Sequence, residues 1–204
     1  MASVEAQLRV MLAQGALELP RPGGGSTSRR WAALIGWGRH DLALARLAEG
    51  HTDAVAILAE ADRLPVPAAL CGVWAARSGG VGARLHRAHG GLGLGGSVRF
   101  CSGAGLVDRA LVVAEAPADA VGDPLLVEVA LADTRVHRRH GTRRTAAMDD
   151  TETQDVDFDD VPVRPDAWLA IPAGTPHGPG SRSAGRGEWL RFGGAARPVC
   201  STGC

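Results

Sequence analysis

A run of small and apolar residues near the middle of the chain has the pattern of a ligand-binding strand. Val98 and Phe100 alternate with Arg99 and Cys101, which predicts a strand with one apolar face. The segment Ser102–Gly105 follows, and its small residues allow a flat or charged group to approach the backbone closely. We therefore expect this strand to form one wall of a cofactor site, although the pattern does not name the cofactor.

The histidines do not have the spacing of a metal or catalytic cluster. His137 and His140 stand beside arginines, whose charge would repel a metal ion, so a solvated strand edge or loop is the simpler interpretation. His86 and His89 lie in a glycine-rich turn and should be exposed. His51 lies at a helix junction, where a capping or hydrogen-bonded core histidine is the first interpretation and a catalytic base the alternative. The sequence predicts no metal site.

The glycine-rich segment Gly91–Gly96 fits the pattern G-x-G-x-x-G. A dinucleotide-binding fingerprint needs this pattern between a strand and a helix, whereas the next segment here is the strand that contains Val98. The pattern therefore favours a glycine-rich hairpin.

The four cysteines are too few and too scattered for a disulfide framework, so a reducing, cytoplasmic environment is expected. Cys200 and Cys204 form too short and too isolated a pair to hold zinc. Cys101 should point away from the face of its neighbours and be a buried, inert thiol.

The acidic residues between positions 149 and 160 predict one wet face of a strand. Asp155, Asp157 and Asp159 alternate with Val156 and Phe158, as in a half-buried sheet. Nothing in this pattern raises the pKa of a carboxyl group or places it beside a reacting carbon, so none is assigned as a catalytic base.

Periodicity divides the chain into helices followed by strands. Apolar residues at helical spacing predict helices within residues 1–20, from about 26 to 48, and from 52 to 61, with Gly50 as the stop between the last two. After Pro67, short apolar runs separated by Gly and Asp predict an antiparallel barrel or sandwich. The predicted class is α+β. Its parts are an N-terminal helical segment (1–66), a middle β-barrel domain (67–166) and an irregular or disordered tail (167–204).

Charge and hydropathy exclude several function classes. The 204 residues contain 22 basic and 22 acidic side chains, so no net field favours nucleic acid or a membrane surface. No apolar run reaches the roughly 20 residues of a membrane span, and Met1–Glu5 lacks the basic start of a signal peptide. The sequence predicts a cytoplasmic protein that binds neither nucleic acid nor membranes.

Three blocks resemble the acyl-CoA dehydrogenase family, in the same order and with similar spacing. Gly36–His51 is similar to the family's second-helix signature, in which an acidic residue and small apolar residues precede a Gly-His-like turn. Phe100–Gly105 is similar to the family's flavin-contacting strand. Met148–Val163 is similar to the segment that closes its middle β-domain.

The resemblance implies a fold and a chemistry. The family has an N-terminal helical domain, a middle β-barrel and a C-terminal four-helix domain, with FAD bound between the barrel and the C-terminal helices, often across a dimer interface. A carboxylate removes the α-proton of an acyl-CoA thioester, and hydride passes from the β-carbon to flavin N5. The implied cofactor is FAD, the implied substrate is an acyl-CoA thioester, and the implied protein partner is a second copy or a full-length relative.

The resemblance also implies cofactor-binding residues. Phe100 matches the aromatic residue packed on the flavin ring, Ser102 matches the hydroxyl residue at the flavin edge, and Cys101 lies between them. Val73 and Trp74 match the first flavin strand, although the family usually has Thr or Ser, then Glu-Pro, in this part of the strand.

The catalytic base is not among the residues that match. In the family it lies on the C-terminal helices, so the catalytic residue here is unknown, and His51 is the residue that falls in the region facing the acyl pocket. Past Val163 the family continues with its helical domain, whereas Gly178–Arg186 reads like GC-rich DNA translated out of frame. This difference predicts a frameshift after about Asp166.

The sequence therefore predicts an acyl-CoA dehydrogenase-like flavoprotein, an oxidoreductase of fatty acid metabolism, truncated and weakly active or inactive alone. Two alternatives stay open. One is a non-catalytic remnant or interaction module. The other is a flavin-dependent monooxygenase of the same fold, which uses reduced flavin and oxygen.

Overall fold

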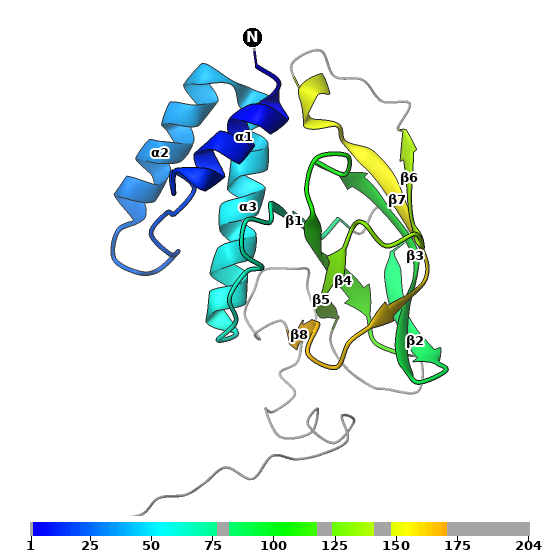
Figure 1. Ribbon diagram of the computed structural model, residues 1–204. Helices are drawn as coiled ribbons and strands as arrows, with labels where there is room; N and C mark the ends of the chain where they lie inside the picture. The colour runs from blue at the N-terminus through cyan, green and yellow to red at the C-terminus, as the bar shows by residue number, and fades with distance from the viewer. Residues whose placement is uncertain (1, 77–81, 118–123, 141–147, 171–204) are drawn as a thin grey trace, which may run out of the picture.

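The computed structural model describes residues 2–76, 82–117, 124–140 and 148–170. Within these residues, helices are followed by strands, which confirms the predicted α+β class (Figure 1). The helical elements are α1 (Val4–Ala13), α2 (Thr27–His40), α3 (Leu42–Glu60) and the 3-10 helix η1 (Asp149–Thr151). The strands are β1 (Cys71–Trp74), β2 (Ala83–Ala88), β3 (Gly91–Cys101), β4 (Arg109–Glu115), β5 (Leu125–Ala130), β6 (Val136–His140), β7 (Gln154–Val163) and β8 (Trp168–Ala170).

Helix α1 has the local signals that its sequence predicts. Ser3 Oγ accepts the N–H of Ala6 at 3.2 Å, which caps the first turn. Val4 and Leu8, four residues apart, are buried on one side of the helix. Gly15 follows the helix with φ of +70°, a left-handed conformation that glycine adopts without strain.

The boundary between α2 and α3 differs from the prediction. The sequence predicts a stop at Gly50, but α2 ends at His40 and Gly50 lies inside α3. Asp41 is extended, with φ of −158° and ψ of 121°, and its Oδ1 accepts the N–H of Leu44 at 2.9 Å. This side-chain cap starts a new helix, whereas a glycine inside a helix costs only about 1 kcal/mol.

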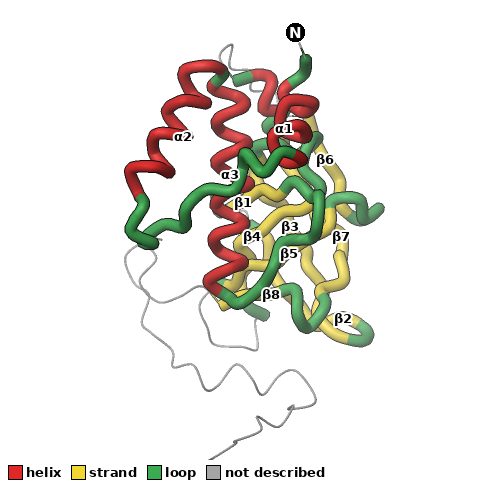
Figure 2. The backbone as a smooth tube through the Cα atoms, turned by 60° about the vertical axis from the view of Figure 1, so that its left-hand side comes forward, coloured by secondary structure: helices red, strands yellow, loops and turns green. Residues whose placement is uncertain are grey.

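Helix α3 is the centre of the helical layer. It lies between α2 and the sheet in Figures 1 and 2, and it contacts α1, α2, β1 and η1. Its buried side chains therefore face two directions, as expected for a helix covered on both sides. In the described part of the chain, no helix is both long and apolar enough to cross a membrane.

The strands form one mixed sheet with the order β6-β7-β3-β2-β4-β5-β8, and β1 pairs with β4 beside this path. Strands β2 and β3 form an antiparallel hairpin with its turn at His89–Gly90, so the predicted hairpin is present, but Gly91–Gly96 lies on its second strand rather than in its turn. Among the described residues, β6 and β8 end the path and the sheet is not closed.

The prediction that all neighbouring strands are antiparallel is wrong along one edge of β4. Strands β1 and β2 both run parallel to β4, β1 opposite Arg109–Val112 and β2 opposite Ala114–Glu115. They therefore occupy successive stretches along one edge of β4. Short strands separated by glycine do not reveal this arrangement, because parallel pairing joins segments far apart in the chain.

Strand β6 lies where His137 and His140 were interpreted as a solvated strand edge or loop, and β8 lies where no strand was predicted. Strand β6 pairs with β7, and β8 pairs with β5. Strand β8 lies inside the predicted irregular tail, so that prediction is wrong for Trp168–Ala170. The rest of the tail, residues 171–204, lies outside the described residues, and the division into three domains stays a prediction.

The core has a main part and a smaller part. The main cluster joins α1 and α3 to the inner face of the sheet, as the two layers of Figure 2 show. The smaller cluster joins the second half of α3, through Ala54 and Leu58, to Leu111, Leu126 and Leu169 of the sheet. Helix α3 thus supplies side chains to both clusters.

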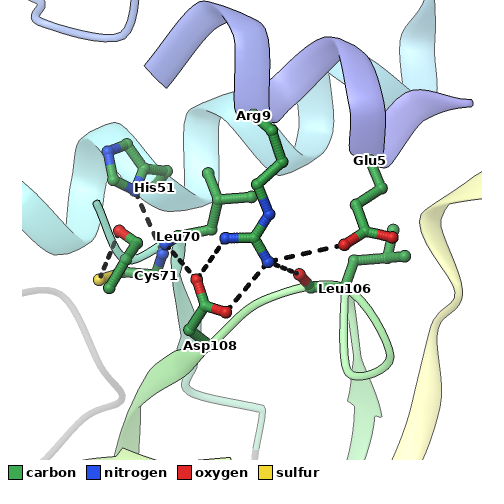
Figure 3. A network of polar contacts seen from close by, with 8 residues as sticks. Glu5, Arg9, His51, Leu70, Cys71, Leu106 and Asp108 are labelled. Carbon is green, nitrogen blue, oxygen red and sulfur yellow. Dashed lines mark hydrogen bonds and ion pairs between the residues drawn. The ribbon is translucent and has the colours of Figure 1, made fainter. Parts of the chain in front are cut away.

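Helix α1 is tied to the sheet by a polar network (Figure 3). Arg9 donates two hydrogen bonds to the Asp108 carboxylate, at 2.5 and 3.0 Å, and one to the carbonyl of Leu106 at 3.2 Å. Asp108 also accepts the N–H of Leu70 at 2.7 Å. The hydrogen bond from Arg9 holds the pKa of the Asp108 carboxyl below its usual value, and partial burial opposes that shift.

We expect Asp108→Ala to lower the free energy of unfolding by about 1–2 kcal/mol, because it leaves both Arg9 and the N–H of Leu70 without their acceptor. Arg9→Ala should cost less, because the bond to Leu70 remains. Since the folded-state pKa of Asp108 is depressed, its contribution is present above the unfolded pKa of about 3.9 and is lost as pH falls further. Urea unfolding at pH 7 and pH 3 measures both effects.

The control for these two variants is Glu5→Ala. Glu5 lies 3.6 Å from Arg9 in an exposed pair on one helix, and such pairs contribute little. Equal losses from Arg9→Ala and Asp108→Ala would contradict the assigned role of the bond to Leu70.

Candidate functional site

A pocket of about 260 Å³ opens between α3 and the sheet. Three of its residues come from α3, and the others come from β1, from the loop after β1 and from β3. Its lining consists of Arg46, Gly50, Asp53, Val73, Trp74, Ala75, Ala76, Arg99 and Phe100. The predicted cofactor strand and the predicted first flavin strand therefore meet here.

The α3 side of the pocket follows from residue spacing. Arg46, Gly50 and Asp53 are four and three residues apart, so they share one face of the helix. A Cβ atom added at Gly50 would meet no atom within 4 Å. The missing side chain at this position leaves the pocket open between two charged residues.

The β3 side of the pocket contains a β-bulge. Val98 pairs with Val156 and Cys101 pairs with Gln154, so two residues, Arg99 and Phe100, lie opposite the single residue between those partners on β7. Phe100 has φ of +60°, which is rare for a bulky residue.

The bulge overturns the predicted apolar face of this strand. Val98 is 2 % exposed and Cys101 is fully buried, whereas Phe100 is 38 % exposed and lines the pocket. Val98 and Phe100 therefore do not share a buried face. Because of the extra residue, Phe100 does not follow the alternation of inward and outward side chains, and Cys101 faces the interior instead.

Trp74 joins the two predicted flavin strands. Its side chain is 4 % exposed, and its Nε1 donates to the carbonyl of Ser102 at 3.0 Å. The Ser102 hydroxyl lies 3.4 Å from Thr153 Oγ1, and Ser102 lines a second, very small pocket together with Val73. Ser102 thus lies beside the main pocket rather than in its wall.

Of the five predicted cofactor-binding residues, three line the main pocket: Val73, Trp74 and Phe100. Cys101 points the other way, into the core. Burial raises the pKa of the Cys101 thiol to about 12, so it is an uncharged thiol at pH 7. Its predicted contact with a cofactor would have to involve the backbone.

His51 lies on α3 but is not among the residues that line the main pocket. Its Nδ1 accepts the N–H of Cys71 at 3.1 Å (Figure 3). Burial lowers the pKa of His51 to about 4, so the ring is neutral at pH 7 and carries its proton on Nε2. This is the hydrogen-bonded core histidine of the first interpretation, and the substrate-side role stays a prediction.

The charged residues of the pocket have opposite charges beside them. Arg46 lies 2.9 Å from Glu49, and Asp53 lies 2.5 Å from Arg30, whose side chain is buried beneath it. Burial raises the pKa of the Asp53 carboxyl, and the charge of Arg30 opposes that shift. The pocket therefore has an aromatic and aliphatic wall with neutralised charges at its rim.

The other candidate groups do not join this pocket. His86 pairs with Asp160 at 2.8 Å across β3, and a Cβ atom at Gly93 would lie 2.1 Å from Asp160 Oδ1, so this glycine makes room for the pair. Among the described residues, no three His, Cys, Asp or Glu side chains are grouped as metal ligands. Cys200 and Cys204 lie outside the described residues.

Sequence reasoning missed Arg46, Asp53 and Arg99 as pocket residues. The signal for the first two was their position on one face of a single helix, and the predicted stop at Gly50 placed them on two different helices. Arg99 was expected on the face opposite Phe100, and only the bulge brings both side chains to the pocket.

Comparison with solved structures identifies the fold. No family model and no curated protein matches the chain. The methanesulfinate monooxygenase MsuC from Pseudomonas fluorescens is similar with a TM-score of 0.64 and 16% identity, over 82% of this chain and 46% of that chain. The dibenzothiophene monooxygenase TdsC from Paenibacillus sp. A11-2 is similar with a TM-score of 0.57 and 18% identity, over 83% of this chain and 51% of that one. The complex of TdsC with FMN and indole gives 0.58 and 19%, over 83% and 51%.

These likenesses show that the chain shares its fold with the corresponding parts of MsuC and TdsC. The chain spans about half the length of these solved structures. Membership of the acyl-CoA dehydrogenase family itself stays a prediction.

Replacing His51 should change how stability depends on pH. The unfolded histidine has a pKa of about 6.5 and the folded one of about 4. The unfolded state therefore binds the extra proton between these values, and this group should remove about 2 kcal/mol of stability between pH 7 and pH 5.

His51→Asn retains a side-chain acceptor for the N–H of Cys71 but does not titrate in this range. We expect its free energy of unfolding, measured in urea at pH 7, 6 and 5, to fall less steeply than that of the wild type. Parallel pH profiles of the two proteins would show that His51 does not titrate as a buried group.

Proposed function

We propose that this chain forms the flavin-binding wall of an oxidoreductase, and that the protein is a flavin-dependent monooxygenase rather than an acyl-CoA dehydrogenase. The observation that carries the proposal is the pocket in which Trp74 and Phe100 meet between α3 and the sheet. The strands that supply these two residues are the ones that resemble flavin strands in the sequence.

The residues present suit a flavin ring. A flat aromatic ligand is bound well by exposed aromatic faces and small apolar side chains, and Phe100, Val73 and Ala75 supply these. The volume of about 260 Å³ lies just below the roughly 300–1,000 Å³ of complete ligand sites. The pocket is therefore large enough for part of a flavin, and the rest of the cofactor would need a second surface.

The monooxygenase assignment is supported by the comparisons and by one residue. The similar structures above are named as monooxygenases, and one of them is a complex with FMN. Trp74 stands in the part of the strand where the resembling dehydrogenases have a hydroxyl residue and then Glu-Pro, and its indole nitrogen is already bonded to the carbonyl of Ser102.

When bound, reduced flavin would supply the two electrons with which one oxygen atom of O₂ is transferred to a substrate and the other leaves as water. The contribution of this chain is to hold and orient the ring and to keep charge neutralised around it. We propose FAD or FMN as the flavin. An acyl-CoA substrate, closure of the sheet into a barrel, a cytoplasmic location and pairing with a second copy or a longer relative stay predictions.

Flavin titration tests the proposal directly. The full chain is titrated with oxidised and with chemically reduced FMN and FAD under anaerobic conditions, and bound flavin is then exposed to a panel of acyl-CoA thioesters. We expect tighter binding of the reduced form and no bleaching by acyl-CoA. Bleaching would assign the dehydrogenase instead, and failure of both redox forms to bind would favour the non-catalytic alternative.

Phe100→Ala should weaken flavin binding about fivefold, because a ring-stacking contact of this kind contributes about 1 kcal/mol. The change should leave the fold intact, because Phe100 is half-exposed and outside the core clusters. Fluorescence quenching of FMN gives the dissociation constant. Trp31→Ala is the matched control, since Trp31 is an exposed aromatic residue on α2 outside the pocket lining, and its loss should leave the constant unchanged.

A further inference from the structure

We propose that Asp155 is a positioning residue, which holds Phe100 and Arg99 at the mouth of the pocket and so presents the aromatic wall to the ligand. This inference rests on the proposed function. Asp155 lies on β7 and is not among the residues that line the pocket, so it acts through its two neighbours on β3.

The bulge makes Asp155 the single partner of two residues. With Val98 paired to Val156 and Cys101 paired to Gln154, Asp155 is the residue left opposite Arg99 and Phe100. A bulge locally disrupts the ladder of backbone hydrogen bonds. The backbone N–H of Phe100 is satisfied by a side chain instead, because Asp155 Oδ1 accepts it at 3.1 Å.

The second carboxylate oxygen holds Arg99. Asp155 Oδ2 lies 3.6 Å from Arg99 Nε, and the Arg99 guanidinium carbon lies 4.9 Å from the centre of the Phe100 ring. Cation–π contact and ion pair therefore place the guanidinium over the aromatic ring. One carboxylate thus fixes the backbone of Phe100 and the side chain that lies on its ring.

The conformation of Phe100 needs such support. A φ of +60° is sterically unfavourable for an aromatic residue, and it persists only where the surroundings impose it. The ring is 38 % exposed in this conformation, whereas regular alternation would turn it to the side of Val98, which is 2 % exposed. The aromatic wall that Phe100 forms in the pocket therefore depends on the bulge.

The chain offers a graded set of variants. Asp155→Ala removes both interactions, and Asp155→Glu keeps the charge but moves the oxygens away from the N–H of Phe100. Asp155→Asn keeps a neutral acceptor for that N–H. Asp159→Ala is the matched control, because Asp159 is an exposed carboxylate on the same strand.

The experiment measures two quantities for each full-length variant. Amide hydrogen exchange by NMR reports the N–H of Phe100 without any ligand, and FMN fluorescence gives the dissociation constant. For Asp155→Ala and Asp155→Glu we expect exchange at Phe100 to accelerate and FMN binding to weaken, each by about tenfold, the effect of one hydrogen bond. Exchange at Val98 should not change, and Asp159→Ala should resemble the wild type. Asp155→Asn keeps an acceptor for the N–H of Phe100 but loses the charge that pairs with Arg99, so exchange at Phe100 should resemble the wild type and FMN binding should fall between the wild type and Asp155→Ala.

Three results would overturn the inference. Asp155→Ala could leave both quantities unchanged, it could weaken FMN binding without faster exchange at Phe100, or Asp155→Asn could lose as much as Asp155→Ala. If Asp155→Ala does not fold, Asp155→Glu decides the same questions. A wild type that binds no flavin refutes the proposed function, whereas normal flavin binding with unaltered exchange in the loss variants refutes only the role of Asp155.

Discussion

The burial of α3 between the sheet and the other helices is the constraint on which the rest of the structure depends. Its side chains enter both hydrophobic clusters, Leu47 in the main one and Leu58 in the smaller one. Between them, the neutral ring of His51 accepts the N–H of Cys71 at the start of β1. Helix α3 thus supplies the hydrogen-bond acceptor for a backbone N–H of β1. Strand β1 contains Trp74, so this contact helps to hold Trp74 at the pocket.

The pocket arises from two local departures from regular structure, a glycine inside α3 and a bulge in β3, and the sequence indicated neither. The resemblance to flavin strands indicated Trp74 and Phe100 as cofactor-binding residues. Both line the pocket, and their contact with a flavin stays a prediction. The sequence did not indicate the α3 side of the pocket, because the predicted helix stop at Gly50 placed Arg46 and Asp53 on two different helices. A glycine is a common helix stop, and nothing local distinguishes a stop from a glycine that leaves space inside a helix.

Much of the fold could be predicted because its elements have a local period. Helix α1 and strand β7 lie where the period predicts them, and β4 and β5 are short apolar runs of the kind expected after Pro67. The start of α3 depends on the cap that the Asp41 side chain forms. The apolar residues keep their helical period on both sides of Asp41, so this period does not reveal the boundary between α2 and α3. The parallel pairing of β1 and β4 depends on segments about forty positions apart, and no local pattern records it.

The two-for-one pairing on β3 has a consequence for how the wall of such a pocket can vary. Side chains of a strand alternate, so facing inward is a matter of odd or even position. Leu94 and Val98 are buried at even positions, and Cys101 is buried at an odd one. Loss of Arg99 would restore regular alternation, with Val98 and Cys101 still facing inward and the aromatic ring left alone on the outer side. Proteins with this sheet can therefore differ in whether a cation lies over the aromatic ring of this wall, through a change in length alone.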